Sequence, residues 1–310
     1  MVSAVFHSPS DASDALRADK ASAATPSSNP MTTSIPTPAT AVTPKASAKP
    51  KRPPVDWGAL ALKVISPVAG LALLIAIWGL LTMKSTTFPT PAATWDAAVV
   101  LFSDPFYDNG PNDQGLGWNI LFSLKRVAMG FGLAALVGIP LGFLIGRSKV
   151  IGSMLNPIIS LLRPVSPLAW LPIGLLVFKS ADPAAIWTIF ICSIWPMIIN
   201  TAVGVQRVPE DYLNVAKVLN LSEWKIVTKI LLPSVLPYML TGVRLSVGTA
   251  WLVIVAAEML TGGVGIGFWV WDEWNNLNVQ HIIIAIVVIG VVGLLLEQAL
   301  VSIANRFSFE

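Results

Sequence analysis

The chain has 310 residues, of which 54% are hydrophobic and 12% are charged, and its formal net charge is +3. Soluble domains carry about 25% charged residues, so this composition excludes an ordinary soluble enzyme and indicates an integral membrane protein. The single cysteine, Cys192, excludes a disulfide framework. The sequence holds no Cys/His cluster with metal-ligand spacing and no recognisable catalytic grouping, so we expect neither a metal site nor a catalytic residue in this chain.

Residues 1–54 are rich in Ala, Ser, Thr and Pro and hold few large apolar side chains. Such a segment buries too little apolar surface to offset the entropy of ordering it, so we predict a disordered cytoplasmic tail. It lacks the basic start and continuous apolar core of a signal peptide, and the sequence leaves open whether Met31 is the true first residue. Residues 55–117 are predicted to contain the first transmembrane helix and an outer loop, and residues 118–310 the main transmembrane domain.

Six apolar runs approach the length of about 20 residues that a membrane-spanning helix needs. Pro164, Pro167 and Pro172 interrupt the third run, which we predict to be a broken helix whose freed backbone groups need protein or water partners. The predicted fold class is therefore all-α, with these spans: Leu60–Met83, Trp118–Gly146, Leu161–Phe178, Ala184–Val205, Val235–Met259 and Ile282–Ile303.

The basic residues predict an orientation, because Lys and Arg concentrate in cytoplasmic loops. Four of them crowd the entrance to the first span, which predicts a cytoplasmic N-terminus. Six crossings then place residues 209–237 and the C-terminus in the cytoplasm as well. The loop after the first span is acidic, which fits an outer location. The basic residues behind this prediction are Lys45, Lys49, Lys51, Arg52, Arg147, Lys149 and Arg306.

Small residues recur at four-residue intervals along the second span. Residues four apart lie on one face of a helix, and small side chains on that face let the backbone of another helix approach closely. We therefore predict a helix-packing stripe made of Gly130, Ala134, Gly138, Gly142 and Gly146.

The polar segment Pro209–Pro237 lies between the fourth and fifth spans. We predict a helix from its start to about Leu219, ended by Asn220 in the left-handed conformation. Ser222 then caps a second helix, which we expect to stop at Pro233. These residues alone favour two interpretations equally: a solvated helical loop, or a docking surface for a soluble partner.

This segment resembles the cytoplasmic EAA loop of ABC importer permeases, the loop that couples the permease to its ATPase in that family, so Pro209–Pro237 is called the coupling loop from here on. That pattern is Glu-Ala-Ala, three residues, Gly, nine residues, Ile, one residue and Leu-Pro. The spacing fits throughout, although the residue types depart from the pattern at its first, second and fourth positions. The resemblance implies that this loop sits in a groove of an ATPase subunit, and we expect Ala216 and Leu219 to enter that partner surface. The matching positions are Asn214, Val215, Ala216, Asn220, Ile230, Leu232 and Pro233.

Further stretches between residues 115 and 305 resemble the nitrate, sulfonate and taurine branch of type I ABC importer permeases. They are SLKRVAMGF (Ser123–Phe131), GIPLG (Gly138–Gly142), RPVSPLAWLPIG (Arg163–Gly174) and GVRLSVGTAWLVIVAAEML (Gly242–Leu260). Two others, FYDNGPNDQGLGW (Phe106–Trp118) and GIGFWVWDEWN (Gly265–Asn275), resemble the nitrate-type permeases, which also cover nitrite, cyanate and bicarbonate.

The resemblance implies an inner-membrane permease that imports a small anion by alternating access. Nitrate is the first expectation; nitrite, cyanate, bicarbonate and organic sulfonates remain open. The implied partners are cytoplasmic ATPase subunits, an extracytoplasmic binding protein and a second permease, most simply an identical copy, whereas no nucleic acid is expected. The sequence contains no G-x-x-x-x-G-K-[ST] phosphate loop, so we expect no cofactor on this chain and ATP use by the partner subunits.

Two alternatives belong to other classes of protein. A secondary carrier driven by an ion gradient often shows inverted internal repeats, which this sequence lacks. An integral-membrane enzyme would need a catalytic cluster, and none is recognisable.

Ionisable residues inside the predicted spans are candidates for function, because charge is costly there. Arg244 and Glu297 lie at similar depths, and Arg126 and Glu258 both lie near the outer face. Each pair is interpreted either as a structural ion pair or as a contact for the passing anion. Arg244 is the better candidate for the second role, because a fixed guanidinium suits a planar oxyanion.

Overall fold

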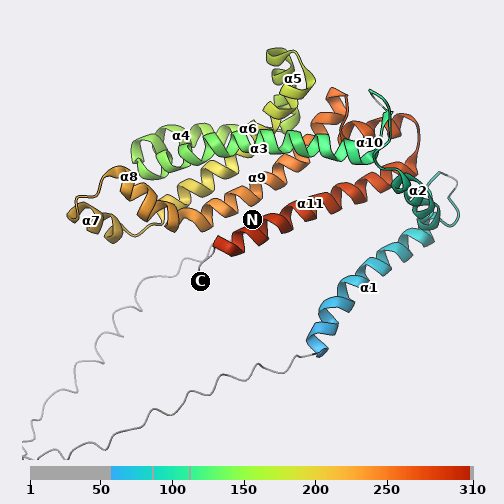
Figure 1. Ribbon diagram of the computed structural model, residues 1–310, viewed down its shortest axis with the longest axis horizontal. Helices are drawn as coiled ribbons and strands as arrows, with labels where there is room; N and C mark the ends of the chain where they lie inside the picture. Colours follow the sequence, from blue (N-terminus) through green and yellow to red (C-terminus); the bar gives the residue numbers. More distant parts are fainter. Residues whose placement is uncertain (1–56, 86, 112, 308–310) are drawn as a thin grey trace, which may run out of the picture. The chain divides into compact units, whose positions relative to one another are not determined.

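A computed structural model describes residues 57–85, 87–111 and 113–307 of the chain. The chain divides into two units, Met1–Trp57 and Gly58–Glu310. The predicted tail, residues 1–54, lies outside the described residues. The second unit is almost entirely helical (Figure 1).

Six elements precede the middle of the chain: α1 (Trp57–Thr82), α2 (Pro91–Ser103), the antiparallel strands β1 (Asp108–Gly110) and β2 (Asp113–Gln114), α3 (Leu116–Arg147) and α4 (Lys149–Leu162). The others are α5 (Pro167–Phe178), α6 (Ala181–Gln206), α7 (Glu210–Val218), α8 (Glu223–Ile226), the π-helical turn η2 (Val227–Leu231), α9 (Leu232–Thr261), α10 (Ile266–Asn275) and α11 (Val279–Phe307).

Five helical segments of the described chain are long and apolar enough to cross a membrane. They are α1, α3, α6, the continuous stretch Glu223–Thr261 and α11. The pair α4–α5, whose helices are bent by 100° at their junction, makes a sixth if it counts as one span. The prediction of an all-helical membrane protein with about six spans is confirmed.

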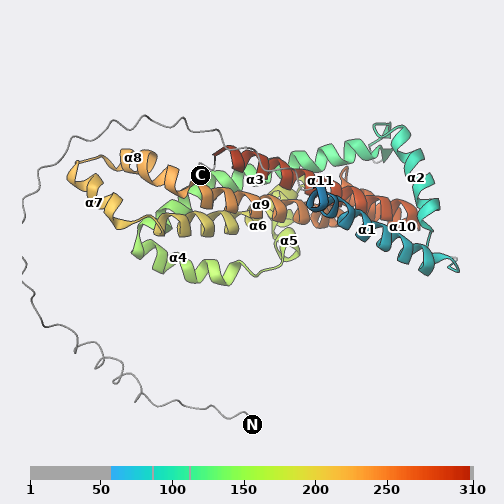
Figure 2. The ribbon, with the colours of Figure 1, turned by 90° about the horizontal axis from the view of Figure 1, so that it is seen from below.

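Helix α3 lies directly against α6 (Figures 1 and 2). A Cβ atom added at Gly130 would lie 2.6 Å from the Cβ of Ile189, and one at Gly142 would lie 2.6 Å from the Cβ of Thr201. Residue numbers increase in the same direction along both helices from the first pair to the second, so α3 and α6 are parallel. The face of α3 that meets α6 is the predicted stripe: Gly130, Gly138, Gly142 and Gly146 each lie against α6, and Ala134 is fully buried.

Helix α9 packs on α6 in the opposite direction, and α11 packs on α9. The Ser246 hydroxyl of α9 donates a hydrogen bond to the carbonyl of Ser193 (2.7 Å). The Trp251 indole N–H donates to the carbonyl of Ile289 on α11 (3.0 Å). The core therefore consists of α3, α6 and α9, with α11 along one side.

The third predicted span differs from the structure. The chain bends at residues 163–166, whereas Pro172 lies inside α5 without ending it. Ser166 is extended (ψ 136°), as the residue before a proline prefers. Pro167 then begins α5 at a position where its missing N–H costs no hydrogen bond. The preceding helix α4 was not predicted.

The predicted helix end at Pro233 is wrong. Residues Glu223–Thr261 form one continuous helical segment that includes the π-helical turn η2. Pro233 is the second residue of α9, directly after η2. A proline breaks the regular backbone ladder by its missing N–H, and the wider π-helical turn absorbs that break without ending the helix.

Candidate functional sites

The coupling loop folds as a compact helical pair at one end of the bundle, where α7 and α8 project beyond α6 and α9 (Figures 1 and 2). Asn220 has a φ angle of 47°, in the left-handed region where the sequence placed the end of the first helix. The N–H of Leu221 donates to the carbonyl of Ala216 (3.0 Å), and that of Asn220 donates to the carbonyl of Lys217 (3.0 Å). These two bonds form a Schellman motif, which fixes the turn.

The loop packs into a small apolar cluster that it shares with the end of α6. Ala216 is fully buried in this cluster, which also contains Ile226, Leu231 and, from α6, Val205. The expectation that Ala216 enters a partner surface is therefore wrong, because its side chain fills the interior of the loop. Ser222 stands at the start of α8, but its hydroxyl makes no capping hydrogen bond.

The outer surface of the loop carries large apolar side chains in exposed positions. Val218 is 81% exposed and Leu219 63% exposed. A cluster of this kind on a charged loop is a feature of interaction surfaces. The other exposed members of the cluster are Tyr212, Val215 and Trp224.

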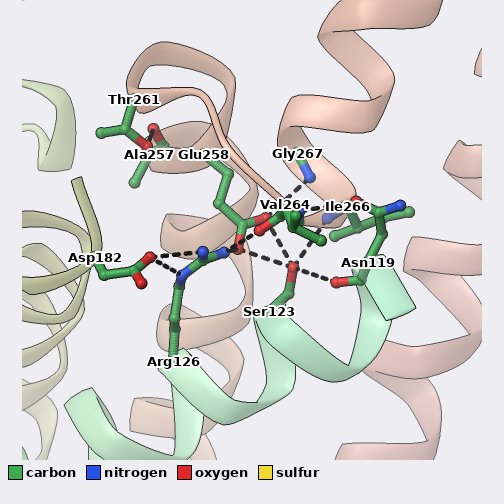
Figure 3. A network of polar contacts seen from close by, with 11 residues as sticks. Asn119, Ser123, Arg126, Asp182, Ala257, Glu258, Thr261, Val264, Ile266 and Gly267 are labelled. Atoms are coloured by element: carbon green, nitrogen blue, oxygen red, sulfur yellow. Dashed lines mark hydrogen bonds and ion pairs between the residues drawn. The ribbon is translucent and has the colours of Figure 1, made fainter. Parts of the chain in front are cut away.

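A buried polar network holds the opposite end of the bundle together (Figure 3). Glu258 of α9 is 1% exposed, and its carboxylate accepts hydrogen bonds from the Arg126 guanidinium (2.7 Å) and the Ser123 hydroxyl (2.8 Å), both on α3. It also accepts the backbone N–H of Gly267 (3.0 Å). A buried charge is tolerated when it is paired and fully hydrogen-bonded, as this one is.

Arg126 uses most of its donors inside this network. Besides Glu258, it donates to the carbonyl of Val264 (2.6 Å) and to the carboxylate of Asp182 at the start of α6 (2.8 Å). Asp182 is 65% exposed, so the network reaches the surface at this residue. The arrangement links α3, α6 and α9 with the loop that follows α9.

The loop Gly262–Gly265 and the start of α10 lie so close to α9 that two positions require glycine. A side chain on Gly265 would collide with the Glu258 carboxyl group, and one on Gly267 would collide with the carbonyl of Val255. The Gly265 N–H donates to the Asn119 side-chain oxygen (2.8 Å). Loop and α3 are thereby held in one fixed arrangement.

Arg244 on α9 and Glu297 on α11 form the second predicted ion pair. Their side chains are 53% and 46% exposed, unlike those of the buried network. Both line a pocket of about 450 Å³ between α9 and α11, together with Thr241, Gly248 and Gly293. Charge therefore faces an open, mostly apolar space in the middle of two spans.

Comparisons with known proteins identify the family. Residues 138–308 match the model of the binding-protein-dependent transport system inner membrane component. The nitrate import permease protein NrtB of Synechocystis sp. is 49% identical over 237 residues, covering 76% of this chain and 86% of that protein. The bicarbonate transport system permease protein CmpB of Synechocystis sp. is 45% identical over 241 residues, with the same coverage. The chain belongs to this family of ABC importer permeases.

A solved structure shows the same fold. One permease chain in the inward-facing MetNI methionine ABC transporter superposes with a TM-score of 0.55 at 15% identity, covering 63% of this chain and 96% of that chain. This permease is therefore the non-catalytic transmembrane subunit of an ABC transporter, a multi-pass inner-membrane protein. Separate ATPase subunits hydrolyse the ATP, and a binding protein serves the transporter.

Three members of the permease's buried network were not predicted: Asn119, Ser123 and Asp182. Asn119 and Ser123 precede Arg126 by about two turns and one turn of α3, so all three lie on one face. A polar stripe in an apolar span was the available signal. The contribution of Asp182 depends on how α6 packs, and nothing in its local sequence indicates it.

Proposed function

We propose that this permease forms the transmembrane path of an importer for nitrate. The observation that carries the proposal is the identity to nitrate import permeases, 49% for the Synechocystis sp. protein and 50% for that of Leptolyngbya laminosa. The bicarbonate permeases of Synechocystis sp. and Synechococcus elongatus are 45% and 44% identical. Nitrite and cyanate are further candidate substrates of the same path.

Bicarbonate is the second candidate, because it closely resembles nitrate in shape and charge. Both are planar, singly charged oxyanions that accept hydrogen bonds from a guanidinium in the same geometry. They differ in the hydroxyl group of bicarbonate, which also donates a hydrogen bond. Organic sulfonates fit less well, since the taurine permease TauC of Escherichia coli is 30% identical.

Uptake by reconstituted transporter tests the proposal. The permease would be placed in liposomes with its own ATPase subunits and binding protein, and given labelled nitrate or labelled bicarbonate. We expect ATP-dependent nitrate uptake that a tenfold excess of bicarbonate inhibits weakly. Uptake of bicarbonate alone would replace nitrate by the second candidate. Uptake of either anion without the ATPase subunits would instead support a secondary carrier.

We further propose that the coupling loop is the docking site of the ATPase. Its rigid turn at Asn220 and its buried core suit a part that transmits force, and its exposed apolar residues suit a groove in a partner. The positions matched to the EAA pattern divide accordingly. Ala216 lies inside the loop, and Val215 and Asn214 lie on its surface. Ile230 belongs to η2, and Leu232 and Pro233 are the first two residues of α9.

A homodimer is the simplest complete path, because charges that one copy leaves exposed need water or a second copy around them. Of the two ion pairs, Arg244–Glu297 is the better candidate for contact with the anion, since its side chains are about half exposed. The Arg126–Glu258 pair is assigned a structural role instead, because four of the five guanidinium donors of Arg126 are engaged.

A further inference from the structure

Arg163, the residue that ends α4, is an exposed cation of the helical bundle. The residue is exposed, and none of the ion pairs in the described part of the chain includes it. Arg126 and Arg244, by contrast, are each bonded to a carboxylate. The charge of Arg163 is therefore uncompensated within the described residues.

The packing of α4 places Arg163 well inside the membrane. Helix α4 packs against α3 and runs back beside the bundle from the Arg147 end of α3 (Figures 1 and 2). Its 14 residues extend roughly 21 Å at about 1.5 Å per residue, and Arg163 caps their far end. It therefore lies within a hydrocarbon layer about 30 Å thick.

The backbone at this depth is irregular. Helices α4 and α5 are bent by 100° at residues 163–166, which we call the elbow. Pro164 within it and Pro167 after it carry no N–H, and Ser166 is exposed. Irregular backbone at membrane depth is tolerated where protein buries it or where it lines a water-filled cavity. Since one copy of the chain leaves the elbow exposed, water or a second copy must cover it.

The charge of Arg163 favours water. An arginine facing lipid is costly, and charged residues inside membrane segments face cavities or partners. No acidic residue lies between Arg147 and Lys179, so no carboxylate on α4, on α5 or on the elbow between them neutralises Arg163. Water or an anion beside the guanidinium meets this need.

We propose that the elbow lines the water-filled path of the transporter and that the Arg163 guanidinium contacts the anion as it passes. This proposal deepens the proposed function and rests on it. A guanidinium presents paired N–H donors in a plane, which match two oxygens of a planar oxyanion. An uncompensated arginine attracts such an anion more strongly than one already paired with a carboxylate, as Arg244 is.

Cysteine labelling tests the location without relying on transport. The chain has one cysteine, Cys192, and it is buried, so the unsubstituted permease is the matched control. In the assembled transporter, a negatively charged methanethiosulfonate reagent should leave the control unmodified and modify Ser166→Cys, an exposed elbow position that keeps Arg163 in place. Nitrate should slow that modification severalfold. An unreactive cysteine would overturn the proposal, and so would a reactive one that neither nitrate nor bicarbonate protects.

Transport measurements test the role of the charge. Arg163→Gln should lower the maximal rate of nitrate uptake at least tenfold while the ATPase subunits remain bound, and Arg163→Lys should recover part of the loss. Lys149→Gln, at the exposed start of α4, removes a charge elsewhere on the same helix and should change little. Normal uptake by Arg163→Gln would refute this proposal alone. A wild-type transporter that imports neither anion would refute the proposed function, and the labelling result would still locate the elbow.

Discussion

Glu258 shows how a carboxylate is kept inside a membrane protein. It is 1% exposed, yet it accepts bonds from a guanidinium, a hydroxyl and a backbone N–H. Removing one partner of a buried ion pair costs more than removing both, because the remaining charge is left uncompensated. The ion pair should therefore behave as a unit when it is mutated.

Arg126→Gln should destabilise the permease by about 3–5 kcal/mol, since it leaves Glu258 charged and unpaired. The double change Arg126→Gln with Glu258→Gln should recover part of this loss, because no buried charge remains. Thermal unfolding in detergent would measure both. Lys125→Gln is the control: it removes a neighbouring, exposed charge and should leave the unfolding temperature nearly unchanged. Equal losses in the single and double variants would show that the two residues are not energetically coupled.

Residue types alone predicted some of these positions and missed others. The two ion pairs followed from depth, because Arg244 and Glu297 lie at matching distances from the same membrane surface. Which hydroxyl or backbone N–H completes the network around Glu258 depends on how α10 folds back onto α3. That arrangement involves residues far apart in the sequence, such as Ser123 and Gly267, and no local pattern encodes it.

At the scale of elements, the stripe on α3 was predictable because small residues at four-residue intervals lie on one face of a helix and let another helix pack closely there. The elbow and the π-helical turn were harder. Prolines mark both regions, but Pro172 and Pro233 end no helix whereas the bend falls at residues 163–166. Whether a proline ends a helix depends on the partners that its freed carbonyls find, and the sequence does not list those partners.

The contact between α3 and α6 should be sensitive to added volume on one face of α3 only. Gly142→Val would push a side chain into Thr201 and the carbonyl of Ile198, and overpacking of this kind costs about 1–3 kcal/mol. Gly132→Val is the matched control on the same helix, because nothing lies within 4 Å of its added Cβ. The yield of folded permease and its unfolding temperature should fall for the first variant and hold for the second. Equal behaviour would mean that the two helices separate readily.

The coupling loop should lose its partner when a charge is placed on its exposed apolar surface. Val218 is 81% exposed, so Val218→Glu should fold normally, but burying its carboxylate against an ATPase subunit costs several kcal/mol. We expect loss of copurifying ATPase and of uptake. Val218→Thr, similar in shape and uncharged, should retain both. Ala216→Glu should instead destabilise the loop itself, because Ala216 lies in its core. ATPase that still copurifies with Val218→Glu would exclude this surface as the docking site.

For the whole molecule, charge separates the two ends of the bundle. The end with the coupling loop carries Arg147 and Lys149, whereas the other carries the acidic β1–β2 hairpin and α10, with Asp272 and Glu273. Basic residues favour the cytoplasmic side. The uneven distribution of basic and acidic residues, from which the orientation of the spans was predicted, therefore separates the two ends of the folded bundle.

Reporter fusions should establish that orientation. Green fluorescent protein joined to the C-terminus should fluoresce, and alkaline phosphatase joined there should be inactive, because we expect both termini in the cytoplasm. Alkaline phosphatase fused after Asp104, beyond α2, should be active. An active C-terminal phosphatase would reverse the topology and would move the coupling loop away from any cytoplasmic ATPase.

The continuous helical segment Glu223–Thr261 has a thermodynamic consequence. Its 39 residues extend about 58 Å at 1.5 Å per residue, from the coupling loop to the network around Glu258, with no flexible loop between. If ATPase binding favours one position of this helical rod, the network at its far end shifts with it. Binding of a partner at the far end must then favour the same position of the rod at the ATPase, with the same coupling free energy. We therefore expect reciprocity: a protein that binds the outer end more tightly in one position of the rod will raise the affinity for ATP in that position by the same factor.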